Sequence, residues 1–215
     1  MNFQGERENL LRHLRHKGYV RTAHVEAAML SVPRELFVPP LIRRDSYLDR
    51  PLPILGGQTI SAPHMVAEMC EVAELERGMN VLEVGAGSGY NAAVMAQLVN
   101  PGFVYSTEVV PSLVQGAKKS LDLAGITNVM VTDSDGSIGW KEYAPYDRIV
   151  VTCASPGIPP PLVKQLDKGG IMIIPVGDLY LQALTIISKD SKGKVTRKKK
   201  MGCVFVPMKG KHGFH

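Results

Sequence analysis

A short apolar run that ends in closely spaced glycines constrains the fold of this chain more than any other feature. Residues 81–89 read Val-Leu-Glu-Val-Gly-Ala-Gly-Ser-Gly, and a helical pattern of apolar residues follows from residue 90. Glycine has no Cβ atom, so its backbone can turn tightly and come close to a ligand. A strand, a glycine turn and the start of a helix, in this order, are typical of a nucleotide-type cofactor site in an α/β protein.

The chain beyond this turn alternates between strand-like and helix-like patterns. We expect strands at 80–84, 103–107, 128–131, 148–152 and 171–175, and helices at 90–99, 112–124 and 162–166. This alternation predicts an α/β fold with a doubly wound, mainly parallel sheet. Residues 181–188 and 198–206 are expected to add an antiparallel pair, giving seven strands whose final order stays open.

The first third of the chain has a different pattern. Two short helices are predicted at 4–16 and 23–30, and a proline-rich loop carrying Tyr47 and binding groups at 39–62. Pro63 suits the first turn of a helix that ends near Glu74. We expect one domain, in which residues 1–77 form a helical cap and a loop, and residues 78–215 form the α/β core.

The glycine spacing distinguishes between cofactors. Gly85, Gly87 and Gly89 are spaced Gly-x-Gly-x-Gly, whereas a dinucleotide site more often has Gly-x-Gly-x-x-Gly to hold a pyrophosphate. S-adenosylmethionine carries no phosphate, so the spacing favours it. Glu108 ends the next expected strand, where a carboxylate can accept hydrogen bonds from both ribose hydroxyls. Its alternative reading is a surface carboxylate.

Further residues are candidates for the same cofactor site. Glu83 points from the first strand toward the loop, where it could meet the cofactor ammonium or buttress the turn. Asp135 and Gly136 follow the third strand and could border an adenine, although a solvent-exposed turn would explain them too. Ser88 and Val109 are also predicted to contact the cofactor.

Three segments carry a resemblance to a known family. They are Pro-Arg-Glu-Leu-Phe-Val-Pro (33–39), Gln-Thr-Ile-Ser-Ala-Pro-His (58–64) and Phe-Val-Pro (205–207). Together with the glycine run they resemble the protein L-isoaspartate O-methyltransferases, and the likeness covers most of the chain. Segment 58–64 is the most specific, because it is similar to the family's signature for the methyl-accepting carboxylate. The family usually has Gly-Asp-Gly where this chain has Ser-Asp-Gly (134–136), a departure that keeps the aspartate.

The acceptor chemistry also suits segment 58–64. A carboxylate with a pKa near 4 is ionised at pH 7, so it needs alignment and a dry site rather than a general base. Neutral donors serve this better than a cation, which would repel the sulfonium. We therefore predict that Ser61 orients the acceptor carboxylate and that Gln58, Thr59 and Ile60 help to bind the substrate; capping of the following helix is the alternative for Ser61. His64 is expected to help enclose the cofactor or acceptor, with a structural role equally open.

The resemblance implies a Rossmann-like methyltransferase fold and a repair activity. The expected reaction methylates the α-carboxylate of L-isoaspartyl and D-aspartyl residues in damaged proteins and peptides, leaves S-adenosylhomocysteine, and leads to repair through a succinimide. The main rival is an RNA or small-molecule S-adenosylmethionine-dependent methyltransferase. Residues 153–161, after the fourth strand, contain no aromatic residue on which a flipped base could stack, which disfavours an amino-methylating enzyme of nucleic acids.

Composition sets expectations about partners and location. Six basic residues lie within 191–200, and without them 19 basic side chains face 20 acidic ones, so the net charge of +5 is local and is read as a solvated hairpin. The three cysteines Cys70, Cys153 and Cys203 suggest neither a disulfide framework nor a metal site. With no apolar run long enough for a bilayer and no signal peptide, we expect a cytoplasmic monomer that binds neither nucleic acid nor membrane.

Overall fold

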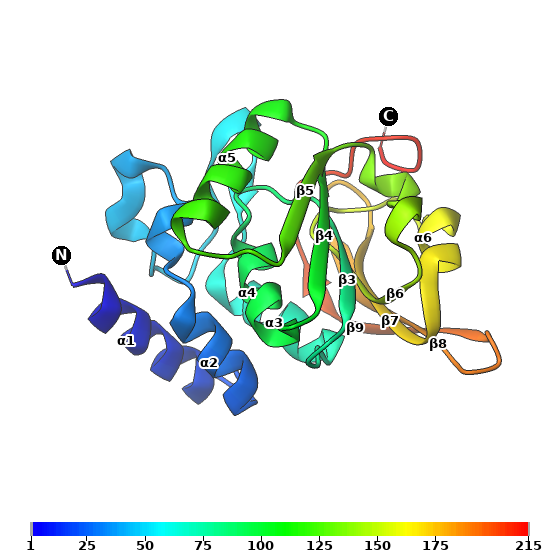
Figure 1. Cartoon of the computed structure of the whole chain (residues 1–215), viewed down its shortest axis with the longest axis horizontal. Helices are drawn as coiled ribbons and strands as arrows, with labels where there is room; N and C mark the ends of the chain where they lie inside the picture. Colours follow the sequence, from blue (N-terminus) through cyan, green and yellow to red (C-terminus); the bar gives the residue numbers. More distant parts are fainter. Residues whose placement is uncertain (1, 215) are drawn as a thin grey trace.

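The computed structural model describes residues 2–214, and a seven-stranded sheet lies at its centre (Figure 1). Its strands are β3 (Asn80–Val84), β4 (Phe103–Glu108), β5 (Val129–Asp133), β6 (Tyr146–Val151), β7 (Leu166–Gly177), β8 (Gln182–Lys189) and β9 (Val195–Cys203). The order is β5-β4-β3-β6-β7-β8-β9; the pairings from β5 to β7 are parallel, and β8 is antiparallel to both β7 and β9. The doubly wound, mainly parallel sheet is confirmed, and its last strands follow the order of the sequence.

The helices and short elements connect these strands. They are α1 (Phe3–His16), α2 (Ala23–Ser31), α3 (Pro63–Ala73), α4 (Tyr90–Val99), α5 (Pro111–Leu123) and α6 (Pro160–Gln165), the 3₁₀ turns η1 (Arg34–Phe37), η2 (Pro40–Asp45), η3 (Leu55–Gly57), η4 (Gly136–Ile138) and η5 (Lys141–Tyr143), and the small hairpin of β1 (Leu52–Pro53) and β2 (Thr59–Ile60). Strand β7 begins earlier than expected, because Leu166 already pairs with Tyr146 before an irregularity in the ladder.

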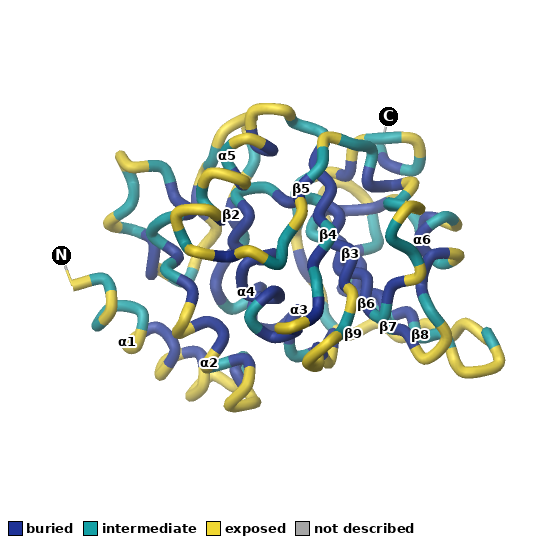
Figure 2. The backbone as a smooth tube through the Cα atoms, in the orientation of Figure 1, coloured by how far each residue is buried: buried dark blue, intermediate teal, exposed yellow. Residues whose placement is uncertain are grey.

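Alternate side chains of each strand face two different layers. Val81 belongs to the apolar cluster that includes residues of α3, α4 and α5, while Leu82 belongs to a second cluster with α6. The first cluster also contains the buried side chains of α1 and α2. Helix α2 packs against α4, and α1 packs against α2. Figure 2 shows the central strands and α4 as the most deeply buried segments. The helical cap thus shares one continuous apolar core with the sheet.

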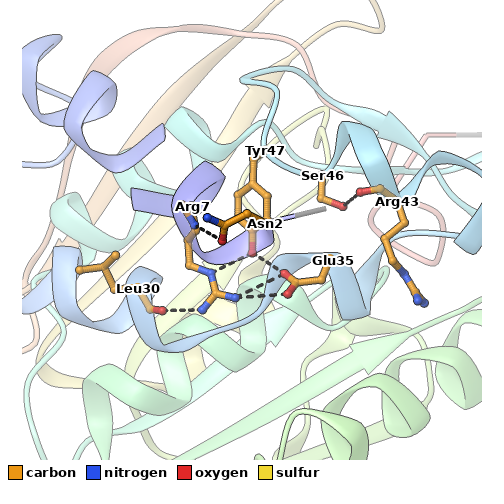
Figure 3. A network of polar contacts seen from close by, with 8 residues as sticks. Asn2, Arg7, Leu30, Glu35, Arg43, Ser46 and Tyr47 are labelled. Carbon is orange, nitrogen blue, oxygen red and sulfur yellow. Dashed lines mark hydrogen bonds and ion pairs between the residues drawn. The ribbon is translucent and has the colours of Figure 1, made fainter. Parts of the chain in front are cut away.

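Tyr47 corrects an expectation about the loop. The proline-rich segment was expected to offer Tyr47 as a binding group, but the residue is only 8% exposed. Its hydroxyl accepts a hydrogen bond from Arg7 Nε at 2.8 Å and donates one to Glu35, as Figure 3 shows. Arg7 also donates to the Leu30 carbonyl at 2.7 Å. Tyr47 therefore joins α1 to η1, and burial raises the pKa of its phenol.

The two ends of the sheet differ in character. The parallel strands end beside the glycine loop and the C-terminal segment, whereas the turn of the β8–β9 hairpin, residues 190–194, lies at the opposite end (Figure 1). The basic run 191–200 forms this hairpin and most of edge strand β9, as expected. Within residues 2–214, no helix is long and apolar enough to cross a membrane.

Candidate active site

One cavity lies at the carboxyl ends of the parallel strands, the usual position for ligands in doubly wound sheets. It opens to solvent and is lined by both apolar and polar residues, as small-molecule sites usually are. Four segments form most of its wall: the acceptor loop (58–61), the glycine loop with the start of α4 (84–88, 90 and 91), residues 107–110 after β4, and the C-terminal segment 206–209. Val66, Ser134, Gly136, Thr152 and Cys153 complete it. Gly89, predicted to contact the cofactor, lies off the wall beside Ala117 of α5.

The glycine loop has a backbone that other residues rarely adopt. Gly85, Gly87 and Gly89 have φ values of +101°, +54° and +86°. The N–H groups of residues 85 and 86 both donate to the Thr107 carbonyl, at 2.9 and 3.0 Å, which ties the loop to β4. A Cβ atom on Gly85 would collide with the Thr152 side chain. The loop can therefore press against the strand ends only because glycines occupy these positions.

Glu108 connects the glycine loop with the segment after β4. One of its carboxylate oxygens accepts from Gly87 N at 2.9 Å, and the other from Val109 N at 2.8 Å and Val110 N at 3.0 Å. The side chain is 7% exposed and faces the cavity. Each carboxylate oxygen has about two lone-pair sites, so three of about four are used and Glu108 retains one, on the oxygen that accepts from Gly87 N, for a ligand hydroxyl.

Glu83 lies beneath the loop rather than on the cavity wall. It is fully buried and accepts hydrogen bonds from Asn91 Nδ2 at 2.8 Å and Ser106 Oγ at 2.5 Å. Burial raises the pKa of Glu83 to about 7, against the opposing effect of these two hydrogen bonds. Asn91 itself lines the cavity, so Glu83 holds a wall residue in place from behind. This position favours the buttress among its two predicted roles.

Glu83 should make stability depend on pH. The pKa of its carboxyl is about 7 when folded against 4.5 as the unperturbed value, so the folded chain binds this proton more tightly than the unfolded chain. The contribution of Glu83 to the free energy of unfolding is thus largest below pH 4.5 and falls through pH 7, by on the order of 3 kcal/mol. Wild type should lose stability relative to Glu83→Gln between pH 5 and pH 8 in urea titrations. If wild type and Glu83→Gln differ by the same unfolding free energy at pH 5 and at pH 8, the Glu83 carboxyl does not have a raised pKa in the folded protein.

Asp135 and Gly136 hold the turn after β5 against the C-terminal segment. The Asp135 carboxylate accepts from Ser137 N at 2.9 Å and Lys211 N at 2.8 Å. Burial alone would raise its pKa, but these hydrogen bonds lower it overall. Asp135 lies off the cavity wall, whereas Gly136 lies on it and has no room for a Cβ atom beside Thr107. Ser134, where the family has glycine, also reaches the cavity.

The acceptor loop brings its four predicted residues to the cavity mouth. Gln58, Thr59, Ile60 and Ser61 all line it. Among residues 2–214, the Ser61 hydroxyl makes no hydrogen bond, and the cap residue of α3 is Ala62, which has no side-chain hydrogen bond. The capping alternative for Ser61 is therefore wrong.

The side chain of Asp49, from the preceding loop, caps the start of α3 instead. Its carboxylate accepts from the backbone N of His64 at 2.9 Å and lies 2.8 Å from His64 Nδ1. The His64 ring packs against Tyr19, with 5.0 Å between the ring centres, and does not line the cavity. His64 thus supports the start of α3, close to the acceptor loop but behind it.

Sequence reasoning missed Arg34, which holds the acceptor loop in place. Its guanidinium is fully buried and donates to the carbonyls of Ser46 and Ser61, both at 2.8 Å. It also lies over the Tyr90 ring, 4.7 Å from the centre, and Tyr90 lines the cavity. Only the motif Pro33-Arg34-Glu35 in the family resemblance signalled this residue.

The cavity has polar atoms that lack a partner within the described chain. Asn91 Oδ1 and Ser134 Oγ are buried and make no hydrogen bond. Such orphaned atoms are costly unless a ligand or water satisfies them. With the glycine cradle and Glu108, they fit a ligand that brings both an amino group and hydroxyls.

Cys153 also lines the cavity, but burial raises the pKa of its thiol, which makes it a poor nucleophile. Residues 2–214 contain no group of three or more His, Cys, Asp or Glu that could hold a metal.

Comparison with known proteins gives a consistent result. Residues 5–213 match the family described as Protein-L-isoaspartate(D-aspartate) O-methyltransferase. Proteins named protein-L-isoaspartate O-methyltransferase are 52% identical in Hyperthermus butylicus, covering 99% of this chain and 92% of that protein, and 57% identical in Methanosarcina mazei, covering 92% and 82%.

Two solved structures of the same name are similar as well. A putative protein-L-isoaspartate O-methyltransferase from Plasmodium falciparum, in complex with S-adenosyl-L-homocysteine, superposes with a TM-score of 0.84 at 27% identity, covering 94% of this chain and 98% of that one. A second, named protein-L-isoaspartate O-methyltransferase, has a TM-score of 0.86 at 33% identity and covers 96% and 67%.

Proposed function

The chain belongs to the protein-L-isoaspartate(D-aspartate) O-methyltransferase family, and on this premise we propose how its residues divide the work of the reaction. The fold is the Rossmann-like methyltransferase fold with an N-terminal helical cap. The enzyme transfers a methyl group from S-adenosylmethionine to the carboxylate of isoaspartyl residues in proteins and peptides, and S-adenosylhomocysteine is the second product.

The cofactor-binding residues divide into those on the wall and those behind it. When bound, S-adenosylmethionine supplies an electrophilic sulfonium methyl group. Glu108 would accept a hydrogen bond from a ribose hydroxyl, and the glycine loop with Ser88 and Val109 would enclose the ligand. Gly136 and Ser134 would border the adenine, and Asn91 Oδ1 would accept a hydrogen bond from an amino group of the cofactor. Glu83, Asp135 and His64 act indirectly, because each one holds a neighbouring segment in position.

The acceptor carboxylate is oriented by Ser61. The observation that carries this proposal is a hydroxyl of the cavity lining that makes no hydrogen bond inside the described chain, in the same cavity as the glycine loop. It can donate to one carboxylate oxygen and leave the other free to approach the methyl group. An ionised carboxylate needs no base, so the task of the loop is to align the atoms and exclude water. Gln58, Thr59 and Ile60 form the rest of this acceptor wall.

Ser61→Ala should lower kcat for an isoaspartyl peptide about 10- to 30-fold, since one hydrogen bond to a charged group contributes about 1.5 to 2 kcal/mol. The Kd for S-adenosylmethionine should not change. The assay uses labelled cofactor and two peptides that differ only in one isoaspartyl or normal aspartyl residue, with Ser112→Ala, an exposed serine of α5, as the matched control. Full turnover by Ser61→Ala would refute its role, and base-labile label on neither peptide would refute carboxyl methylation.

We further propose that the chain acts as a single-domain, cytoplasmic monomer without a nucleic-acid or membrane partner. In support, the basic run lies on the edge strand and hairpin at the end of the sheet away from the cavity. Charged side chains on an exposed edge strand oppose pairing with another chain, which gives this run a role without any ligand. Light scattering of the purified protein at several concentrations tests the oligomeric state.

A further inference from the structure

The turn between β7 and β8 exposes three consecutive apolar side chains. Leu179, Tyr180 and Leu181 are 52%, 85% and 62% exposed. Val204, which follows the last β8–β9 pair of Gln182 with Cys203, is 71% exposed. We refer to these four residues as the apolar turn patch. Contiguous exposed apolar groups of this kind commonly mark an interaction site.

The turn is held rigid by hydrogen bonds, so its exposure is a fixed feature of the fold. One carboxylate oxygen of Asp178 accepts from Tyr180 N at 2.8 Å and from Leu181 N at 2.9 Å. The side chain of Gln182 donates to the Asp178 carbonyl at 2.6 Å. A preorganised surface loses little entropy when a partner binds, which favours a binding role over a loose connection.

The same glutamine connects the patch to the wall of the active site. The Gln182 side-chain oxygen accepts from Phe205 N at 2.8 Å, and the next residues, Val206 and Pro207, line the cavity. The patch therefore adjoins the cavity wall across Phe205.

We propose that the apolar turn patch binds the polypeptide that flanks the isoaspartyl residue, with an aliphatic or aromatic side chain of the substrate against Tyr180. This inference rests on the proposed role of the cavity. Since the acceptor residue is part of a chain, its neighbours must cross the rim of the cavity, and the patch continues that rim. Tyrosine and leucine contacts tolerate many sequences, as an enzyme that meets damage in varied contexts requires.

The size of the patch argues against a second copy of this chain as the occupant. A stable interface buries about 800 Å² on each partner, usually from some 20 to 30 residues, whereas the patch has four. Its position next to the cavity wall also matches an extended peptide better than a folded partner.

The test compares two peptides with the same isoaspartyl residue. One is a tripeptide, and the other has about six residues on each side with leucine and tyrosine among them. The variants are Tyr180→Ser and Leu179→Ser/Tyr180→Ser, and the matched control is Leu123→Ser, a 63% exposed leucine that ends α5. KM for the long peptide should rise about 5- to 10-fold in the double variant. Values of kcat, KM for S-adenosylmethionine and KM for the tripeptide should stay as in wild type.

Several outcomes would overturn the proposal. An unchanged KM for the long peptide, or an equal rise for both peptides, would show that the patch does not bind the flank. A wild-type dimer in sedimentation that dissociates in the double variant would assign the patch to a second copy. If wild type binds S-adenosylmethionine yet methylates neither peptide, the proposed function itself fails, which is distinct from failure of the docking surface.

Discussion

Replacing Glu108 by alanine will weaken S-adenosylmethionine binding at least about 100-fold. The carboxylate has two tasks, because it accepts from three backbone N–H groups and faces the cavity as well. Alanine leaves these donors without their acceptor, so the glycine loop loses its connection to the segment after β4. It also removes the acceptor for a ribose hydroxyl. Loss of one hydrogen bond to a charged group costs about 1.5 to 3 kcal/mol, and each backbone donor left without a partner costs about 1 to 3 kcal/mol more, which together correspond to a factor of about 100 or more.

Isothermal titration of the folded variants measures this effect. Glu108→Gln keeps one carbonyl oxygen but no charge, so its Kd should lie between those of wild type and alanine. Asp133→Ala is the matched control, since Asp133 pairs with Glu108 on the neighbouring strand, yet is exposed and off the cavity wall. Binding by Glu108→Ala within threefold of wild type would mean that the cofactor lies elsewhere in the cavity.

The sequence predicted the parts of the fold that depend on local patterns. Apolar runs located every strand of the sheet, although β7 begins five residues before the predicted strand, and the spacing of Gly85, Gly87 and Gly89 located the cavity. These signals are local, because a buried parallel strand and a tight turn each impose their own residue types. The acceptor loop was located by the resemblance of segment 58–64, and all four of its predicted residues reach the cavity.

Contacts between distant segments could not be predicted in this way. Asp135 was expected to face the cofactor, but the C-terminal segment folds back and its Lys211 N–H takes one carboxylate oxygen. Glu83 lies on the correct strand, yet the alternation of that strand turns it toward Asn91 and Ser106 beneath the loop. Tyr47 was expected to be a binding group of the loop, and its burial could not be foreseen because its partner Arg7 is 40 residues away. In each case the deciding interaction comes from a part of the chain that local periodicity does not connect.

Arg34→Lys should lower kcat/KM for the isoaspartyl substrate about 100-fold and change the Kd for S-adenosylmethionine much less. The guanidinium holds the carbonyls of Ser46 and Ser61 at once and stacks on Tyr90. A lysine ammonium is a single point and cannot keep this fork geometry, so the Ser61 backbone is released. A displacement of about 1 Å at a reacting group is sufficient for a loss of this size.

Arg148 supplies the control that separates positioning from stability. It is also a buried arginine, and it donates to the carbonyls of Ala73 at 2.5 Å and Glu74 at 3.2 Å, but at the beginning of β6, away from the cavity. Both Arg34→Lys and Arg148→Lys should lose about 1.5 to 3 kcal/mol of unfolding free energy for a lost charged hydrogen bond. Only Arg34→Lys should lose turnover when both are assayed well below their Tm. An equal loss in Arg148→Lys would show that general loosening of the fold, rather than the position of Ser61, limits methyl transfer.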